Sequence, residues 1–279
     1  MNRPQSTYAT LASGLRLRYR AQGPAGAPWM VLLNGLLSDL TMWAGALPGL
    51  SERFRVLTFD SRGQGQSDAP DSGPYPTALL AQEAWELLDR LGVSRPWLVG
   101  LSNGSSMALE LLAEHPGAFA GAVLTSSMPR IGFSMELKAR HWAKALEVGG
   151  NLLLFDAVAP FLWGDAFLEA RYQVLRAYHQ VVTGRQASPV GNRNQILGIL
   201  GWDIRPRLHQ VKGPVLLLAG AQDLLTPPWK CQETAQGIPH ARFEVVPGVG
   251  HAFPVEDPKR FVARVIAFVD AVGAGLPVS

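Results

Sequence analysis

One short stretch constrains the fold of this chain more than any other, the pentapeptide Gly-Leu-Ser-Asn-Gly at 100–104. The apolar run at 95–99 before it has the composition of a buried strand, and 105–115 after it has that of a helix. A serine in so tight a turn between strand and helix adopts a strained backbone and presents its hydroxyl above the sheet. Glycines flank it because neighbouring backbone passes too close for a side chain. The stretch therefore predicts an exposed nucleophile, Ser102, at a helix N-terminus.

Strands and helices alternate along most of the chain. Continuous apolar runs predict buried strands, and amphipathic stretches predict helices between them. We expect strands at 29–33, 54–59, 95–99, 120–125, 215–220 and 242–246, after an N-terminal hairpin at 8–11 and 15–20. This alternation implies an α/β fold, with a doubly wound, mostly parallel, eight-stranded sheet and helices on both faces. In such sheets ligands bind beyond the carboxyl ends of the strands.

The alternation breaks between Met128 and about Pro206. Helical stretches around 136–147, 151–159, 167–182 and 192–200 replace the strands, and aromatic residues are frequent. We interpret 128–206 as an inserted helical cap, and 1–127 together with 207–279 as the core domain. The cap is expected to cover Ser102 and to shape the substrate pocket. The pocket candidates are Leu37, Met128, Trp142, Trp163 and Phe253.

Composition and charge bear on partners and location. The 25 basic and 22 acidic residues are interspersed, with a net charge of +3, which supports neither nucleic acid nor an anionic membrane as a partner. The single cysteine, Cys231, excludes an intrachain disulfide and fits a reducing compartment. We expect no membrane span and no signal peptide, and therefore a cytoplasmic location. The oligomeric state stays open, a homodimer included.

A nucleophilic serine needs a general base, and the base needs an acid that orients it. Of the six histidines, His251 alone follows the carboxyl end of a strand, in a glycine-flanked loop. Asp223 follows the strand at 215–220 in the same way and is the candidate acid. Asp60 also ends a strand, but Arg62 beside it indicates a structural ion pair. The resulting order of Ser102, Asp223 and His251 is that of the α/β-hydrolases.

Several motifs make the chain resemble an α/β-hydrolase with a helical cap over essentially its full length. They are Asn-Gly at 34–35, where the family usually has His-Gly, Asp-Ser-Arg-Gly-Gln-Gly-Gln-Ser at 60–67, Gly-Ala-Gln-Asp at 220–223, and Gly-His at 250–251 with Glu-Asp-Pro at 256–258. The resemblance implies an oxyanion hole formed by the backbone amides of Leu36 and Asn103. It also implies that neither a metal nor a cofactor is needed. Asn34 departs from the family's histidine, and Asn103 is more polar than is usual beside the nucleophile.

The implied function is that of a serine hydrolase resembling carboxylesterases. Ser102 would attack the carbonyl of a small ester or acyl substrate, and the aromatic cap suggests that this substrate is largely apolar. Carbon–carbon bond hydrolases, lactonases, perhydrolases, lyases and hydroxyacyl-transferring synthases use the same kind of triad and remain open. Dehalogenases and epoxide hydrolases of this fold attack with an aspartate, which Ser102 argues against. A ligand-binding protein without turnover is the alternative from a different class.

Overall fold

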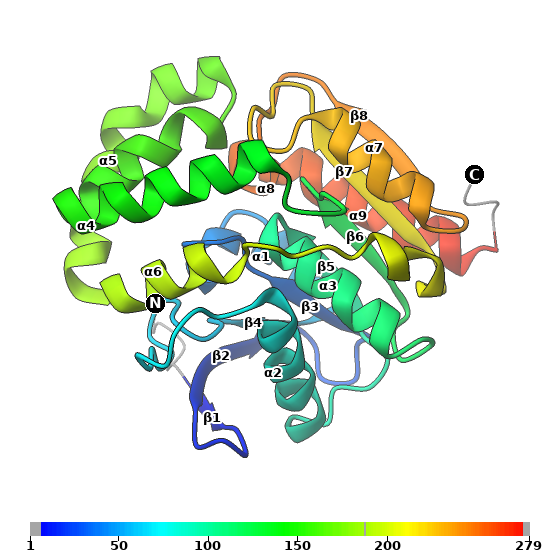
Figure 1. Ribbon diagram of the computed structural model, residues 1–279. Helices are drawn as coiled ribbons and strands as arrows, with labels where there is room; N and C mark the ends of the chain where they lie inside the picture. The colour runs from blue at the N-terminus through cyan, green and yellow to red at the C-terminus, as the bar shows by residue number, and fades with distance from the viewer. Residues whose placement is uncertain (1–6, 187, 276–279) are drawn as a thin grey trace.

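The computed structural model describes residues 7–186 and 188–275, and an eight-stranded sheet lies at its centre (Figure 1). The strands follow the spatial order β1-β2-β4-β3-β5-β6-β7-β8. From β4 to β8 the neighbours pair in parallel, whereas β2 pairs antiparallel with both β1 and β4. This confirms the predicted sheet. The strands are β1 (Thr7–Thr10), β2 (Arg16–Gln22), β3 (Trp29–Leu33), β4 (Arg55–Phe59), β5 (Trp97–Leu101), β6 (Gly121–Thr125), β7 (Val215–Gly220) and β8 (Arg242–Val246).

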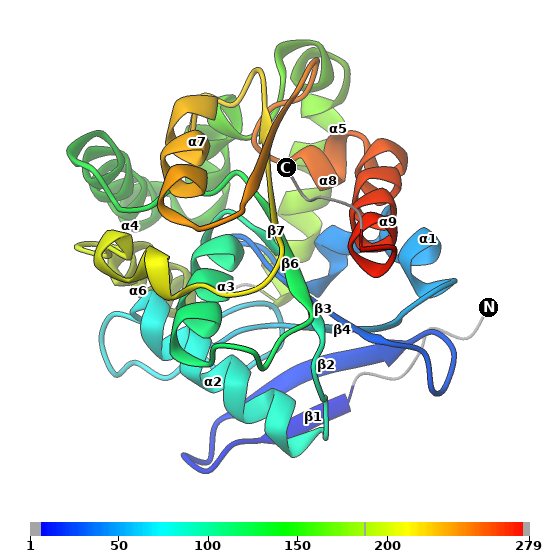
Figure 2. The same cartoon turned by 90° about the vertical axis from the view of Figure 1, so that its right-hand side faces the viewer.

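Helices cover both faces of the sheet (Figure 2). One face carries α2 (Thr77–Arg90), α3 (Asn103–Glu114) and α7 (Pro228–Gly237), and the other carries α1 (Leu47–Ser51), α8 (Phe253–Glu256) and α9 (Pro258–Gly273). The side chains of β3 supply both layers. Val31 and Leu33 join the cluster under α2 and α3, whereas Met30 and Leu32 join the cluster under α9. Because successive side chains of a strand point to opposite faces, a strand covered on both faces is apolar throughout.

Three helices occupy the segment between β6 and β7. They are α4 (Phe133–Leu162), α5 (Asp165–Gln186) and α6 (Pro189–Gly198), followed by the 3-10 helix η2 (Arg205–Gln210). We call α4, α5 and α6 the cap helices. In Figure 1 they lie together beside the end of the sheet, and residues of all three line one cavity with Ser102. A second 3-10 helix, η1 (Leu40–Trp43), follows the loop after β3.

The longest cap helix, α4, is interrupted at Gly149 and Gly150. Gly150 has φ 64° and ψ −163°, far from helical values, so α4 consists of two segments, as the stretches expected at 136–147 and 151–159 indicate. Among the described residues, α4 is the one helix long and apolar enough to cross a membrane by length and composition, which our expectation of no such stretch missed. Trp142 and Phe155 on this helix instead line the cavity beside Ser102. We therefore interpret α4 as a cap helix.

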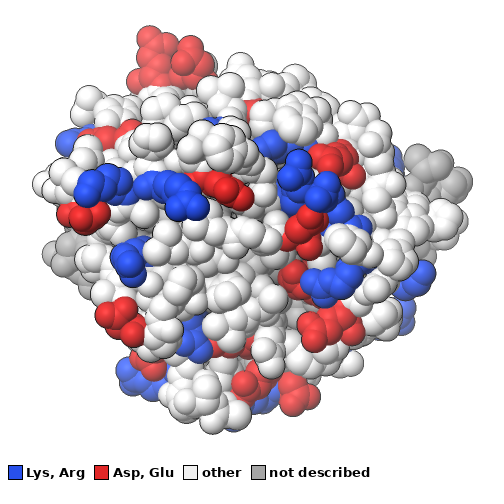
Figure 3. All heavy atoms as spheres, viewed as in Figure 1, with Lys and Arg blue, Asp and Glu red and all other residues white. Residues whose placement is uncertain are grey.

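Charged side chains are scattered over the face of the molecule drawn in Figure 3, with both signs interspersed. Several of the described charges form oppositely charged pairs, such as Arg176 with Asp156 between α5 and α4. The carboxylate of Asp156 also accepts a hydrogen bond from the Tyr172 hydroxyl at 2.8 Å. These contacts join two of the cap helices.

Candidate active site

Ser102 lies between β5 and α3 in a conformation that few residues other than glycine adopt. Its φ is 55° and its ψ is −116°. A Cβ atom on Gly100 would lie 2.6 Å from the backbone N of Ser105, and one on Gly104 would lie 2.1 Å from the carbonyl oxygen of Leu33. Both positions therefore require glycine, because no backbone atom there can move far enough. The predicted turn and its strained serine are present as the pentapeptide indicated.

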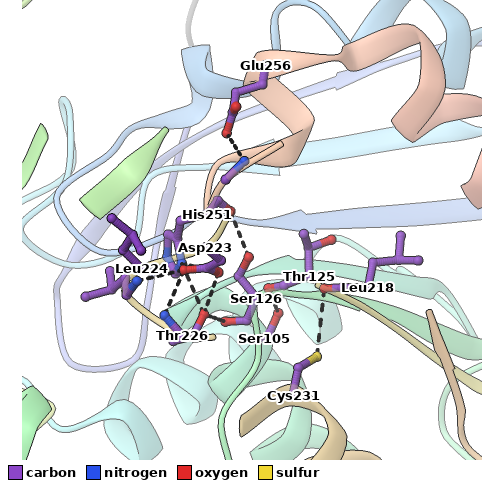
Figure 4. A network of polar contacts seen from close by, with 12 residues as sticks. Ser105, Thr125, Ser126, Leu218, Asp223, Leu224, Thr226, Cys231, His251 and Glu256 are labelled. Atoms are coloured by element: carbon purple, nitrogen blue, oxygen red, sulfur yellow. Dashed lines mark hydrogen bonds and ion pairs between the residues drawn. The ribbon is translucent and has the colours of Figure 1, made fainter. Parts of the chain in front are cut away.

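His251 and Asp223 come from the loops after β8 and β7 and meet beside the cavity (Figure 4). The His251 Nδ1 lies 2.9 Å from Oδ2 of Asp223 and 3.1 Å from Oδ1, and both side chains are buried. The two loops approach so closely that a Cβ atom on Gly220 would lie 2.1 Å from the carbonyl oxygen of Gly250. Ser102 and His251 line the same cavity. The structure thus brings the three residues selected from the sequence into one place.

Hydrogen bonds hold Asp223 in its ionised form. Oδ1 accepts from the backbone N–H groups of Leu225 and Thr226, each at 2.8 Å, and Oδ2 accepts from the Thr226 hydroxyl at 2.8 Å. Burial by itself raises the pKa of Asp223, but the attraction of His251 and these hydrogen bonds outweigh it, so the pKa lies below its ordinary value. An ionised Asp223 accepts the Nδ1 proton of His251 and leaves Nε2 free to take a proton.

Thr226 is a partner of the site that our sequence analysis missed. Its hydroxyl lies 3.1 Å from His251 Nδ1 as well as 2.8 Å from Asp223 Oδ2. The sequence contains a signal for this role. Asp223 is followed by Thr226 and then by Pro227, and an aspartate in such a turn often accepts hydrogen bonds from the backbone N–H groups that follow it. That turn aims the carboxylate of Asp223 at the imidazole.

A second carboxylate, that of Glu256, fixes the backbone before His251. Oε1 accepts from the Gly250 N–H at 2.9 Å, and Oε2 accepts from the Gly164 N–H of the cap at 3.0 Å. Burial raises the pKa of Glu256, although these two hydrogen bonds oppose that effect. On the other side of the loop, the Ser126 hydroxyl donates to the His251 carbonyl at 2.8 Å (Figure 4). The sequence marked Glu256 as part of a motif without showing this role.

Asn34 lies two residues before Leu36, and both polar atoms of its side chain are hydrogen-bonded. Its Nδ2 donates to the Phe59 carbonyl at 2.7 Å and to Gln64 Oε1 at 3.1 Å, and its Oδ1 accepts from the Trp43 indole N–H at 2.8 Å. The residue is buried. In place of the family's usual histidine, Asn34 therefore acts as a support that joins the loop after β3 to the end of β4.

The side chain of Asn103 is hydrogen-bonded to a neighbouring helix. Its Oδ1 accepts a hydrogen bond from the Thr77 hydroxyl at 3.0 Å, which ties the start of α3 to the start of α2. Asn103 is the first residue of α3, so its backbone N–H is among those without a helical acceptor. That amide is therefore suited to an anion beside Ser102.

A cavity of about 510 Å³ extends from Ser102 and His251 between the core and the cap helices. Four of the predicted pocket residues line it, namely Leu37, Met128, Trp142 and Trp163. Most of the remaining lining is also apolar and comes from all three cap helices and the neighbouring loops, including Ile131, Met135, Leu154, Phe155, Val158, Leu162, Leu175, Ile199, Leu225 and Val255.

Phe253 does not line the cavity, and its assignment to the pocket is wrong. Its side chain is fully buried and packs edge-on against Phe261 of α9, with ring centroids 5.5 Å apart. Ala252 and Val255, three residues apart on one side of the short turn, face the cavity instead. On a single helical turn, residue 253 lies on a different side from those two, toward α9.

The sequence suggested an ion pair between Asp60 and Arg62, but the structure pairs each of them with another residue. Its Oδ2 pairs with Arg18 at 3.3 Å, and its Oδ1 accepts from the Leu40 N–H at 2.7 Å. Arg62 instead forms an ion pair with Glu83 of α2. Burial raises the pKa of Asp60, although the backbone hydrogen bonds oppose it. Asp60 therefore supports the loops below the site and takes no part in the cavity wall.

Among the residues that the structure describes, no three His, Cys, Asp or Glu side chains are grouped so as to hold a metal ion. Cys231 is fully buried on α7, and burial raises the pKa of its thiol to about 12. A thiolate, the reactive form of cysteine, is therefore scarce at neutral pH. Ser102, the candidate nucleophile, lines the cavity, whereas Cys231 does not.

A family model described as the alpha/beta hydrolase fold matches residues 28–258. The chain belongs to the alpha/beta hydrolase family. Among its relatives, a putative carbamate hydrolase RutD of Caulobacter sp. (strain K31) is 30% identical over 253 residues, which are 90% of this chain and 94% of that protein. The 3-oxoadipate enol-lactonase 2 of Acinetobacter baylyi is 27% identical over 251 residues, covering 90% of this chain and 91% of its own length.

Solved structures extend the likeness of this alpha/beta hydrolase to three dimensions. The enol-lactonase of Burkholderia xenovorans LB400 superimposes with a TM-score of 0.84 at 32% identity, covering 95% of this chain and all of that one (100%). A hydrolase of Pseudomonas aeruginosa PA01 gives a TM-score of 0.87 at 28% identity, with 96% and 99% covered. The names of these relatives agree on hydrolysis and differ in the bond that is cleaved.

Proposed function

We propose that this alpha/beta hydrolase cleaves a carboxylic ester, or a related acyl bond, of a small and largely apolar substrate. The observation that carries the proposal is the cavity in which Ser102, His251 and the start of α3 meet an apolar wall. A wall of aliphatic and aromatic side chains binds uncharged groups by removing their surface from water. The strained serine supplies a nucleophile, and the His251–Asp223 pair supplies the base that activates it.

The proposed reaction has two steps. His251 Nε2 takes the proton of Ser102 while Oγ attacks the carbonyl carbon, and the amides of Leu36 and Asn103 hold the developing oxyanion. His251 then gives the proton to the leaving alcohol. Water attacks the acyl-enzyme with His251 again acting as base, which releases the acid and restores Ser102. Removing one oxyanion donor costs about 3–4 kcal/mol in such enzymes.

The cavity lining supports an uncharged substrate. No lysine or arginine is found among the described residues that line it. A substrate with a free carboxylate, such as the enol-lactone of 3-oxoadipate, would lose its hydration there without a lysine or arginine to pair with. The lining includes the carboxylate of Asp39, which repels an anion, and His179, whose pKa is lowered by burial and which therefore carries little positive charge at neutral pH. The substrate that we propose is therefore a neutral ester with apolar groups.

A second candidate is the hydrolysis of a neutral lactone, which is a cyclic ester. The likeness to the enol-lactonase of Burkholderia xenovorans LB400 over 95% of this chain favours it. The same nucleophile, base and oxyanion donors would open the ring, and the alcohol would stay attached to the acyl group. A substrate panel that contains both open and cyclic esters separates the two candidates.

The test combines turnover with labelling. We expect the wild type to hydrolyse p-nitrophenyl esters or neutral lactones, and Ser102→Ala to abolish this activity while Ser134→Ala, an exposed serine of α4, retains it. A serine-directed fluorophosphonate should add its mass to the peptide that contains Ser102. Labelling elsewhere, together with activity retained in Ser102→Ala, would show that the proposal is wrong.

A further inference from the structure

A buried side chain of the cap reaches the loop that carries the expected oxyanion donor. Gln195 of α6 is only 1% exposed. Its Oε1 accepts from the Leu37 N–H at 3.3 Å and from Gln64 Nε2 at 3.4 Å. Its Nε2 donates to the Arg62 carbonyl at 3.0 Å. One cap residue thus joins the loop after β3 to the loop after β4.

The peptide group that contains the Leu36 N–H is fixed from its carbonyl side. That carbonyl belongs to Gly35, and it accepts from Gln64 Nε2 at 2.8 Å and from the Ser38 hydroxyl at 2.7 Å. In a planar trans peptide the C=O and the N–H point in opposite directions. Holding the Gly35 carbonyl against Gln64 therefore turns the Leu36 N–H the other way.

The next residue, Leu37, has a strained backbone and is hydrogen-bonded to Gln195. Leu37 has φ 61°, a conformation that side-chain-bearing residues rarely adopt. Such conformations cost of order 1–3 kcal/mol and persist only where the surroundings hold them. The hydrogen bond from the Leu37 N–H to Gln195 is a contact from the cap that holds this residue. Losing Gln195 removes this hold on Leu37 and also one partner of Gln64, the side chain that holds the Gly35 carbonyl.

The face of α6 that carries Gln195 is built for close approach to the core. Gly191, Gln195 and Gly198 are spaced four and three residues apart, so they share one side of the helix. A Cβ atom on Gly191 would lie 2.5 Å from the Gly63 carbonyl oxygen, and one on Gly198 would lie 2.0 Å from that of Tyr75. The two glycines seat α6 on core backbone at both ends, and Gln195 lies between them.

We propose that Gln195 is a positioning residue for the oxyanion hole, through which a seated cap aligns the Leu36 amide. The inference rests on the proposed acyl-transfer function. It implies that enclosure of the substrate and completion of the oxyanion hole are one event, because α6 takes part in both: Asn192 of α6 lines the cavity, and Gln195 holds the loop.

The main test replaces Gln195 by a side chain of similar length that lacks the amide. We expect Gln195→Met to lower kcat for ester hydrolysis about 10- to 100-fold, with KM within about threefold of the wild-type value. The loss is smaller than the about 10²–10³-fold cost of removing an oxyanion donor, because the Leu36 N–H is displaced and not removed. Affinity for a boronic acid that forms a tetrahedral adduct on Ser102 should fall by a similar factor. Affinity for the product alcohol should not change. Gln173→Met on α5, where the glutamine is exposed, is the matched control.

A second variant covers the case in which Gln195→Met fails to fold. Gln195→Glu keeps the shape and the acceptor for the Leu37 N–H. When ionised, its carboxylate cannot donate to the Arg62 carbonyl and places negative charge near the developing oxyanion. We expect its kcat relative to wild type to fall as the pH rises through the pKa of the introduced carboxyl. A ratio that does not change with pH would contradict the positioning role.

Amide hydrogen exchange at Leu37 separates this inference from the proposed function. If Gln195 holds the loop, Gln195→Met should speed exchange of the Leu37 N–H by at least tenfold, whether or not a substrate is known. Unchanged exchange together with an unchanged kcat would overturn the inference alone. A wild type that hydrolyses no ester or lactone would instead overturn the proposed function.

Discussion

Changing Asp223 to asparagine keeps the shape of the side chain and reverses one hydrogen bond. Two backbone N–H groups, those of Leu225 and Thr226, face Oδ1, so the amide oxygen of the variant must occupy that position. The amide NH₂ then takes the place of Oδ2, which lies 2.9 Å from His251 Nδ1. Because NH₂ donates, Nδ1 must accept and the imidazole proton moves to Nε2. In that tautomer His251 cannot take the proton of Ser102.

The expected loss of turnover is large. The corresponding change in a serine protease lowers kcat about 10⁴-fold, which is about 5.5 kcal/mol at 1.36 kcal/mol per factor of ten. A neighbouring carboxylate could reduce this loss, but Glu256 already accepts the N–H groups of Gly250 and Gly164. We therefore expect Asp223→Asn to lower kcat about 10³- to 10⁴-fold, with a small change in KM.

The assay measures kcat and KM on a p-nitrophenyl ester together with the free energy of unfolding at several pH values. The pKa of Asp223 is lowered in the folded state, so its charge stabilises the fold above the unfolded pKa of about 4, and this contribution is lost as the pH falls through the lower folded value. The stability difference between wild type and Asp223→Asn should therefore shrink below about pH 4. Near-normal turnover in Asp223→Asn, with turnover lost in Asp60→Asn at unchanged stability, would show that Asp60 is the acid.

Three further variants test supporting residues. Asp60→Asn should lower the free energy of unfolding by about 1–3 kcal/mol in a urea titration, because an amide cannot accept from all the donors around it, the Leu40 N–H included; a loss of turnover without a loss of stability would contradict this. Asn34→Ala should lower the free energy of unfolding by about 1–3 kcal/mol, since it leaves the Trp43 indole N–H without its acceptor; a melting temperature within 2 °C of wild type would be the contrary result. Trp142→Ala widens the cavity and should raise kcat/KM for octanoate esters relative to butyrate esters. An equal change in kcat/KM for the two esters would show that Trp142 does not limit the space for the acyl chain.

The sequence predicted the sheet and the strained turn at Ser102 because both depend on local rules. A buried parallel strand must be apolar throughout, and a strand–Gly-x-Ser-x-Gly–helix turn leaves few conformations for Ser102. His251 and Asp223 could be selected because the carboxyl ends of parallel strands share one edge of the sheet. The distance of 2.9 Å between them needed the structure.

The errors concern partners that are distant in sequence or that depend on side-chain direction. Arg62 lies two residues from Asp60, yet it pairs with Glu83 of α2 because the loop after β4 turns it outward from the buried carboxylate. Phe253 lies two residues from His251, yet α8 turns it toward Phe261 of α9. Proximity in sequence carries little information about direction where the chain turns within one or two residues.

The contacts of Gln195 are of a kind that sequence alone does not predict. Nothing in a glutamine on a short helix indicates a partner such as the Leu37 N–H, more than 150 residues earlier. The structure places the two glycines on the same face, Gly191 and Gly198, against core backbone, and this close approach brings Gln195 within reach of Leu37. Close packing of this kind depends on the arrangement of whole elements.

The cap contacts the loops of the site through their main chain. Lys138 of α4 donates to the carbonyl of Leu224, next to Asp223, at 3.2 Å, and the N–H of Ala252, next to His251, donates to the Leu162 carbonyl of α4 at 2.8 Å. With Gln195 on Leu37, each of the three loops that carry a proposed site residue therefore has a contact to the cap. A change in the pocket wall alone should alter selectivity between substrates, because it leaves these contacts in place. A change that unseats the cap should lower kcat for every substrate, since it shifts the loops of Asp223, His251 and Leu36, the proposed acid, base and oxyanion donor, together.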